Sequence, residues 1–214
     1  MRVVIAEDAA VLRELLFQML DDRGYEVCAA VGDPDALRAA VTRHRPDAAV
    51  VDIRMPPTHT DEGLRAAIDI RRELPDTGVL LFSQYVETKY VTRLLADGSA
   101  GVGYLLKERV ANIAEFTSAL DRVADGGTAL DPEVVTRLAA AGRKAAEMDT
   151  LTARERDVLS RMAEGRSNAA IADALHVSAG TVEKHVAAVF GKLGLPASDD
   201  DNRRVLAVLK FLRD

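Results

Sequence analysis

The chain has 214 residues and a net charge of −6, and 48% of its residues are hydrophobic and 29% charged. These values are typical of a globular protein with one or two domains. No apolar run approaches the roughly 18 residues of a membrane-spanning helix, and a strand-like segment starts at Arg2, so we expect neither a membrane span nor a signal peptide. A single cysteine, Cys28, argues against a disulfide framework and a cysteine-based metal cluster. We therefore expect a cytoplasmic protein without a membrane partner.

Residues 1–125 alternate between strand-like and helix-like segments. The strand-like segments are short, apolar and mostly β-branched, as is typical of strands buried on both faces; they are residues 2–6, 25–31, 48–52, 78–83 and 101–106. Apolar residues at helical spacing occupy residues 9–22, 34–44, 62–74, 86–97 and 109–124. This alternation predicts the α/β class, with a doubly wound, five-stranded parallel sheet.

The pattern changes after Asp125, where Gly126-Gly127 interrupts it. An Ala-rich, charged stretch follows, and we predict that residues 126–149 form a partly helical linker. Residues 150–214 contain four helix-like segments, which predicts a small all-α domain. The charge distribution agrees with this division, because residues 1–125 hold 21 acidic and 15 basic residues and account for the whole net charge.

Polar residues stand at the ends of four predicted strands. Glu7 and Asp8 follow the first strand, Asp52 ends the third, Ser83 ends the fourth and Lys107 follows the fifth. Because the carboxyl ends of parallel strands lie at one edge of a sheet, we expect these groups to converge. Three crowded carboxylates need a cation, and hard oxygen ligands in an open geometry suit Mg²⁺. An aspartate beside Mg²⁺ and a lysine can act as a nucleophile toward a phosphoryl group.

In order and spacing, these residues resemble the receiver domain of two-component response regulators, a CheY-like domain, over residues 2 to about 124. The matching pieces are Glu7-Asp8, Asp52 followed by RMPP, Ser83, and GYLLK ending in Lys107. The resemblance implies that Asp52 is the phosphoacceptor and that Ser83 and Tyr104 form a switch, in which the ring turns inward as the hydroxyl shifts. The Mg²⁺ ligands that it implies are Asp8, Asp52 and the backbone carbonyl of Arg54, with Glu7 acting mainly through water.

Plainer interpretations of these residues stay open at this point. Asp52 and Ser83 could be turn or helix caps, Tyr104 could be a half-buried strand residue, and Lys107 could be solvated.

The loop after Pro57 is longer and more polar than the shortest family loops. We interpret its His59 as a solvated loop residue rather than a catalytic base. Arg54 and Tyr85 occupy the positions that tune dephosphorylation in the family, and their bulk favours a long-lived phosphoryl group.

Residues 150–195 carry a second pattern. Thr152 and Glu155 form a capping box that opens a helix, Asn168 can cap a short helix over 169–175, and Ser178 can cap a helix over 179–192. Two short helices joined by a tight turn predict a helix-turn-helix, whose second helix enters the major groove of DNA.

This region resembles the LuxR-type effector domain of the NarL/FixJ family through LTARE, Gly165, SNAAIA, TVEKH and KLG. The positions that the family uses for base contacts hold Glu183, Lys184 and Ala187, and those for phosphate contacts hold Thr181, His185 and Lys192. Glu183 could instead be a solvated helix residue, and His185 a packing residue. The neutral charge of this domain implies weak monomer binding, because phosphate neutralisation supplies much of the affinity for DNA. We therefore expect dimerisation.

The last helix-like segment, residues 199–214, is the candidate dimer element. Its apolar residues Val205, Val208, Leu209 and Leu212 recur at helical spacing, and we expect them to pack inside the domain. Leu206 and Phe211 lie elsewhere on the helix and are the predicted dimer contacts. A fully buried helix is the alternative.

The whole pattern predicts a two-component response regulator rather than an enzyme, with only Mg²⁺-assisted self-phosphorylation and slow autodephosphorylation. Its expected partners are a sensor histidine kinase, double-stranded promoter DNA and a second copy, with RNA polymerase as a further candidate. The main alternative is a phosphorylation-independent DNA-binding regulator of the same architecture. An Asp-nucleophile phosphatase is disfavoured, because Arg54 stands where such enzymes place a second acid.

Overall fold

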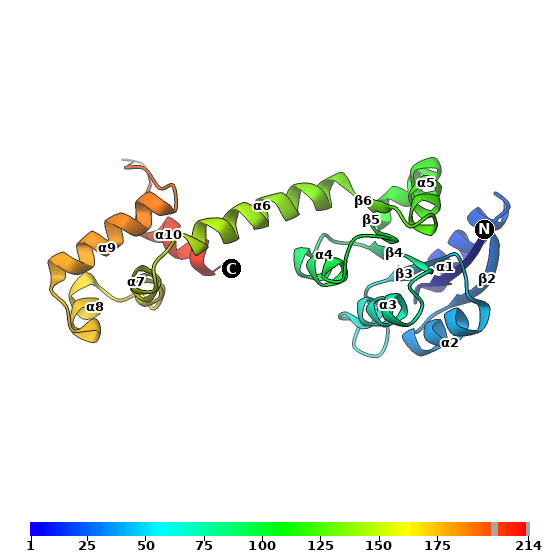
Figure 1. The fold of residues 1–214 in the computed structure, drawn as a ribbon, viewed down its shortest axis with the longest axis horizontal. Helices are drawn as coiled ribbons and strands as arrows, with labels where there is room; N and C mark the ends of the chain where they lie inside the picture. Colours follow the sequence, from blue (N-terminus) through cyan, green and yellow to red (C-terminus); the bar gives the residue numbers. More distant parts are fainter. Residues whose placement is uncertain (198–200, 213–214) are drawn as a thin grey trace. The chain divides into compact units, whose positions relative to one another are not determined.

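The computed structural model describes residues 1–197 and 201–212, together with their side chains except at positions 144 and 145. The chain forms two compact units, Met1–Leu138 and Ala139–Asp214 (Figure 1). The first unit therefore includes part of the segment predicted as a linker. In the described part of the chain, no helix is long and apolar enough to cross a membrane.

The first unit is built on a parallel sheet with the strand order β2-β1-β3-β4-β5-β6. The strands are β1 (Arg2–Ala6), β2 (Glu26–Val31), β3 (Ala48–Asp52), β4 (Gly78–Ser83), β5 (Val102–Leu106) and β6 (Thr128–Leu130). Strands β3, β4 and β5 are buried throughout, which their small and β-branched residues allow. Asp52 pairs with Phe82 and Ser83 with Leu106, so this register brings the ends of the three central strands to one edge.

Helices cover both faces of the sheet. The helices are α1 (Ala10–Asp21), α2 (Pro34–His44), α3 (Glu62–Glu73), α4 (Thr88–Leu95) and α5 (Ile113–Ala124). One core lies between the sheet and α2, α3 and α4, with Leu37, Leu64 and Val91 at its centre. The other core lies between the sheet and α1 and α5, where Phe82 packs edge-on against Phe116. The predicted doubly wound sheet is confirmed.

The sheet has a sixth strand that we did not predict. Strand β6 pairs with β5, with Leu130 opposite Tyr104, and leads directly into helix α6 (Pro132–Asp149). Only three residues long and preceded by Gly126-Gly127, β6 is too short to give a periodic signal. At its end the carboxylate of Asp131, fully buried, forms an ion pair with Arg109 at 2.7 Å and accepts a hydrogen bond from the Glu133 backbone N–H.

The second unit contains α7 (Ala153–Ala163), α8 (Asn168–Leu175), α9 (Ala179–Lys192) and α10 (Arg203–Leu212). The predicted capping box of Thr152 and Glu155 is confirmed, as is the cap by Ser178. The cap of α8 is Ser167 rather than Asn168, so this helix begins one residue earlier than predicted. Helices α8 and α9, joined through His176 in the left-handed conformation, form the predicted helix-turn-helix.

Helix α10 presents to its domain a side that only partly coincides with the predicted one. Ala207 is fully buried and Phe211 packs against the domain core, whereas Val205, Leu209 and Leu212 are 53%, 40% and 65% exposed. Val208 packs against the domain core as predicted, but the prediction that Val205, Leu209 and Leu212 pack there was wrong. The dimer role predicted for Phe211 stays a prediction, although this side chain also packs against its own domain. Leu206 is partly buried. The small Ala207 lets α10 approach its neighbours closely, and Arg204, on the buried side, donates to the side chain of Asn168 at 2.8 Å.

Candidate phosphoacceptor site and DNA-binding helices

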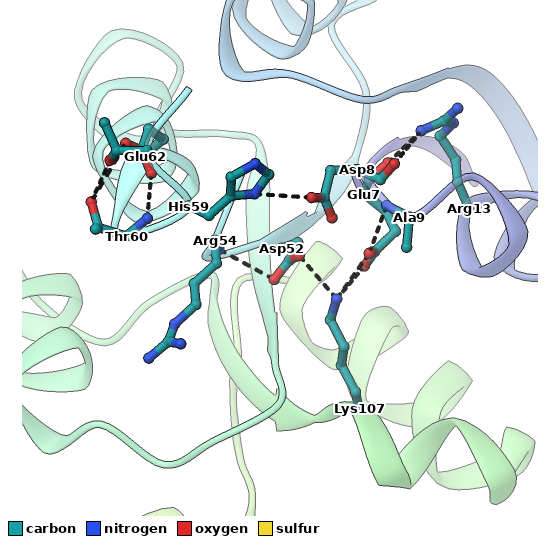
Figure 2. Close-up of polar contacts among 11 residues, drawn as sticks. Glu7, Asp8, Ala9, Arg13, Asp52, Arg54, His59, Thr60, Glu62 and Lys107 are labelled. Atoms are coloured by element: carbon teal, nitrogen blue, oxygen red, sulfur yellow. Dashed lines mark hydrogen bonds and ion pairs between the residues drawn. The ribbon is translucent and has the colours of Figure 1, made fainter. Parts of the chain in front are cut away.

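The carboxyl ends of β1, β3 and β5 bring three acids and a lysine together, as predicted (Figure 2). Glu7, Asp8 and Asp52 each offer a carboxylate oxygen within 4.8 Å of the others. The Nζ atom of Lys107 donates to Asp52 Oδ2 and to Glu7 Oε1, each at 2.9 Å. Glu7 and Asp52 are only 1% and 4% exposed. The interpretation of Lys107 as a solvated lysine does not fit this arrangement. Asp52 does accept a turn hydrogen bond from the Arg54 backbone N–H at 3.3 Å, but its other oxygen is bonded to Lys107, which a turn cap alone does not explain.

Burial dominates the electrostatics of the site. Burial raises the pKa of Asp52, and the hydrogen bond from Lys107 only partly offsets this effect. The pKa of Glu7 is also raised by burial, again against the bond from Lys107, and the nearby charge of Asp52 adds to the increase. Burial alone would lower the pKa of Lys107, but its bonds to the two carboxylates raise it. One lysine thus compensates three acids incompletely, and the site favours additional positive charge.

The donor set fits a divalent cation. Hard carboxylate oxygens from Glu7, Asp8 and Asp52 are the ligand type that Mg²⁺ prefers. Both oxygens of the buried Glu7 carboxylate lie close to Lys107 Nζ, Oε1 at 2.9 Å and Oε2 at 2.7 Å. A cation would therefore share this carboxylate with the lysine. The Arg54 backbone N–H lies 3.3 Å from Asp52 Oδ1, and the metal-binding role of the Arg54 carbonyl stays a prediction.

The predicted switch pair lies beside this site. The Ser83 hydroxyl donates to the Tyr85 carbonyl at 2.9 Å and accepts from the Tyr85 backbone N–H at 3.3 Å. Tyr104 is fully buried, and its hydroxyl donates to the same carbonyl at 2.8 Å. Ser83 is therefore part of a local turn, and Tyr104 is an inward-facing residue rather than a half-buried one. The hydrogen bonds of both hydroxyls therefore depend on the position of the Tyr85 carbonyl.

Arg54 extends from the β3–α3 loop toward the segment that precedes α4. It forms an ion pair with Glu87 at 2.6 Å, and its guanidinium lies 5.5 Å from the centre of the Tyr85 ring. Burial raises the pKa of Glu87, but the hydrogen bonds and charges of Arg54 and Lys89 together lower it below its usual value. The sequence placed Arg54 and Tyr85 near the phosphoacceptor but did not indicate Glu87, whose position depends on the path of the β4–α4 loop.

The β3–α3 loop contributes a residue that our sequence interpretation missed. His59 is half-exposed, yet its Nδ1 atom lies 3.2 Å from Asp8 Oδ2 (Figure 2). The His59 backbone N–H donates to the Met55 carbonyl at 3.1 Å. The only signal in the sequence was the length of the polar loop, which brings residue 59 back over the end of the sheet.

The predicted DNA-contacting residues lie on or beside the outer side of α9. Glu183, Lys184 and Ala187 are exposed, and Thr181 and His185 are partly exposed. Thr181 also belongs to the N-terminal cap of the helix, where its backbone N–H donates to Ser178 Oγ at 3.1 Å. Lys192 is bonded within its own domain, 2.7 Å from the buried Glu155. A phosphate contact by Lys192 would compete with that ion pair.

Comparisons with known proteins agree with both halves of this description. Residues 3–120 match the family model described as the response regulator receiver domain, and residues 149–201 match that of bacterial regulatory proteins of the luxR family. The chain belongs to the LuxR-type response regulators. It is thus a two-component response regulator with a receiver and a DNA-binding domain, and this family generally consists of regulators rather than enzymes.

Similar proteins share nearly the full length of this response regulator. The oxygen regulatory protein NreC of Staphylococcus carnosus is 32% identical over 94% of each chain. A probable transcriptional regulatory protein NarL of Mycobacterium tuberculosis is 36% identical over 91% of this chain and 88% of its own. The solved structure of RcsB from Salmonella typhimurium has the same fold, with a TM-score of 0.61 and 23% identity over 100% and 98% of the two chains. RcsB has also been solved in a complex with DNA.

Proposed function

We propose that Asp52 accepts a phosphoryl group from a sensor histidine kinase and that this modification controls binding of a homodimer to promoter DNA. The observation that carries the proposal is the contact of Lys107 with both Asp52 and Glu7 at the edge of the sheet where three acids meet. A buried aspartate with a raised pKa, next to a lysine and a cation site, is a typical arrangement of a functional rather than a structural group.

The transfer would proceed by in-line displacement. An Asp52 oxygen attacks phosphorus while the bond from phosphorus to the kinase histidine nitrogen breaks, so that the electron pair leaves with the imidazole. Lys107 neutralises one phosphoryl oxygen, and the Ser83 hydroxyl donates to another once it releases the Tyr85 carbonyl. Asp8, Asp52 and the Arg54 carbonyl, with Glu7 through water, would hold a Mg²⁺ ion, which would supply further charge neutralisation. Hydrolysis of the phosphoaspartate would be slow if the bulk of Arg54 and Tyr85, whose guanidinium and ring centre lie 5.5 Å apart, hinders an attacking water.

Helix α10 is the proposed homodimer surface in the DNA-binding domain. Val205, Leu209 and Leu212 replace the predicted Phe211 as the contacts, because they are the exposed apolar residues of α10. A second copy of the same helix would cover them, and two recognition helices would then contact adjacent half-sites. On α9, Glu183, Lys184 and Ala187 would face the bases, and Thr181 and His185 the backbone. RNA polymerase is a further proposed partner of the DNA-bound form.

The test has two measurements, both with Mg²⁺ and with and without beryllofluoride as a phosphoryl mimic. Sedimentation velocity measures dimerisation, and a binding assay with double-stranded DNA of arbitrary sequence measures affinity for DNA. We expect dimerisation and tighter DNA binding in the wild type and in Asp76→Asn, a matched change at an exposed position before β4. Asp52→Asn should show neither response. Equal responses in the wild type and Asp52→Asn, or none in either, would favour the phosphorylation-independent regulator.

A further inference from the structure

Glu7 and Asp8 are adjacent in the chain, yet their carboxylates belong to one site. Neighbouring side chains of a strand point to opposite faces of the sheet, so two adjacent residues can serve the same site only where the chain turns. Strand β1 ends at Ala6, and the chain bends at Asp8. Glu7, Asp8 and Asp52 each offer an oxygen within 4.8 Å of the others. The geometry of the acidic site therefore depends on what holds this bend.

A guanidinium from α1 bonds to the backbone of both acids. The Nη1 atom of Arg13 donates to the Glu7 carbonyl at 2.6 Å and to the Asp8 carbonyl at 3.3 Å (Figure 2). Arg13 is partly buried in the first turn of α1, where its own backbone N–H donates to the Ala9 carbonyl at 2.9 Å. Ala9 precedes the helix and has no polar side-chain atom with which to hold the bend. One nitrogen of Arg13 thus ties the two carbonyls of the acid pair together.

The guanidinium occupies space that a glycine leaves free. Gly32 directly follows β2, and a Cβ atom on it would lie 3.0 Å from Arg13 Nη1, which is tighter than nine in ten real Cβ contacts. The end of β2 is also bonded to the acid pair, because the Glu7 backbone N–H donates to the Val31 carbonyl at 3.0 Å. A side chain at position 32 would therefore displace the guanidinium at the point where it bonds to the acid pair.

We propose that Arg13 is a positioning residue of the cation site, which acts through the backbone of Glu7 and Asp8 and for which Gly32 leaves room. The inference rests on the proposed phosphoacceptor function and names the residue that holds two of its acids in place. If Arg13 acted only through its positive charge, its removal would strengthen cation binding. A positioning role predicts weaker binding, because the two carboxylates lose their common orientation. The sign of the change therefore separates these two roles.

The test is the affinity of the full-length protein for Mn²⁺, obtained from the free Mn²⁺ signal in electron paramagnetic resonance. We expect the Kd to rise about tenfold in Arg13→Ala, as is typical when a supporting group of a metal site is lost. Arg23→Ala is the matched control, because Arg23 lies beyond the other end of α1 and donates to the Met19 carbonyl at 3.0 Å. The Kd of this control should equal that of the wild type.

Gly32→Ala tests the same arrangement without removing a charge or a hydrogen-bond donor. We expect the Kd for Mn²⁺ to rise about threefold in this variant, at the lower end of the coupling between neighbouring residues. In a chain that already carries Arg13→Ala, the added methyl group meets no guanidinium, and the Kd should not change further. Equal effects of Gly32→Ala in the two backgrounds, including no effect in either, would overturn the role of Gly32.

The role of Arg13 and the cation site itself can fail separately. An unchanged or lower Kd in Arg13→Ala, or an equal rise in Arg23→Ala, would overturn the role of Arg13. If Asp8→Ala still abolishes Mn²⁺ binding in that case, the cation site stays intact. Mn²⁺ binding that survives in Asp8→Ala would overturn both the role of Arg13 and the proposed site.

Discussion

Replacement of Gly63 by alanine should damage the receiver domain far more than its position in a helix suggests. Gly63 lies in the first turn of α3, where its backbone N–H donates to the Ile53 carbonyl at 2.9 Å. A Cβ atom at this position would lie 1.7 Å from the Asp52 carbonyl oxygen, whereas real Cβ contacts are not shorter than 3.0 Å. The start of α3 would have to move by about 1 Å or more and would lose this hydrogen bond and the close packing of Leu64.

We expect the loss in unfolding free energy to be about 3 kcal/mol, from overpacking and the lost hydrogen bond together. For a domain of this size, that corresponds to a decrease of about 10 °C in the melting temperature. The displacement reaches the phosphoacceptor strand, so the rate of phosphorylation by small phosphodonors should fall as well.

Differential scanning calorimetry of the full chain would measure the effect, with Gly142→Ala as the matched control. Gly142 lies inside α6, and apart from its chain neighbours and the nearby backbone of its own helix no described atom is within 4 Å of the position that an added methyl group would take. The same substitution there should therefore stabilise the helix by about 0.5–1 kcal/mol. A receiver transition in Gly63→Ala at or above the wild-type temperature would refute the close-packing argument.

Three further predictions concern the site and the dimer surface. The pKa values of Glu7 and Asp52 are raised in the folded protein, so these two groups stabilise the fold most at a pH below their ordinary pKa values, and this stability is lost as pH rises through their folded pKa values. The melting temperature of the receiver should therefore fall as pH rises above about 4.5, and it should fall less steeply in Asp52→Asn. Equal slopes in the two proteins would contradict the assignment. Glu87→Gln removes the carboxylate charge that pairs with Arg54, so the phosphoryl half-life, measured by loss of radiolabel, should shorten about threefold, which is within the free energy of a partly exposed ion pair. An unchanged half-life would show that the position of Arg54 does not depend on its ion pair with Glu87. Leu209→Asp should weaken the activated dimer roughly 100-fold by sedimentation, because about 3 kcal/mol of apolar burial is lost, and an unaltered dimer would place the contact elsewhere.

The position of the phosphoacceptor site could be predicted because it depends on strand order and strand ends. A parallel sheet gathers the carboxyl ends of its strands whatever the loops do, so Asp52, Glu7 and Lys107 had to converge once the five strands were recognised. The chemistry followed from the residue types, since acids and a lysine at one edge leave few alternatives.

The contacts that sequence reasoning missed depend on how loops fold back. Glu87 meets Arg54, and His59 meets Asp8, through segments without periodic structure. Local patterns carry no information on such pairings.

The side of α10 that packs inward was only partly predicted, for a different reason: Val208 lies inside as expected, but Val205, Leu209 and Leu212 do not. The most apolar stripe of a helix is normally the buried one, but here the small Ala207 and the polar bonds of Arg204 determine the packing. An apolar stripe left outside is then available to another molecule.

Strand β6 has a practical consequence for dissecting this protein. A receiver domain cut after residue 125, the boundary that the sequence suggests, would lose β6 and leave β5 with one side unpaired. Strand β5 is buried along its whole length, and uncovered apolar strands of this kind pair with other chains and promote aggregation. The Arg109 side chain would also lose the Asp131 carboxylate. An isolated receiver domain should therefore be soluble, and keep the structure that it has in the full chain, only when it extends through the first turns of α6, to about residue 138.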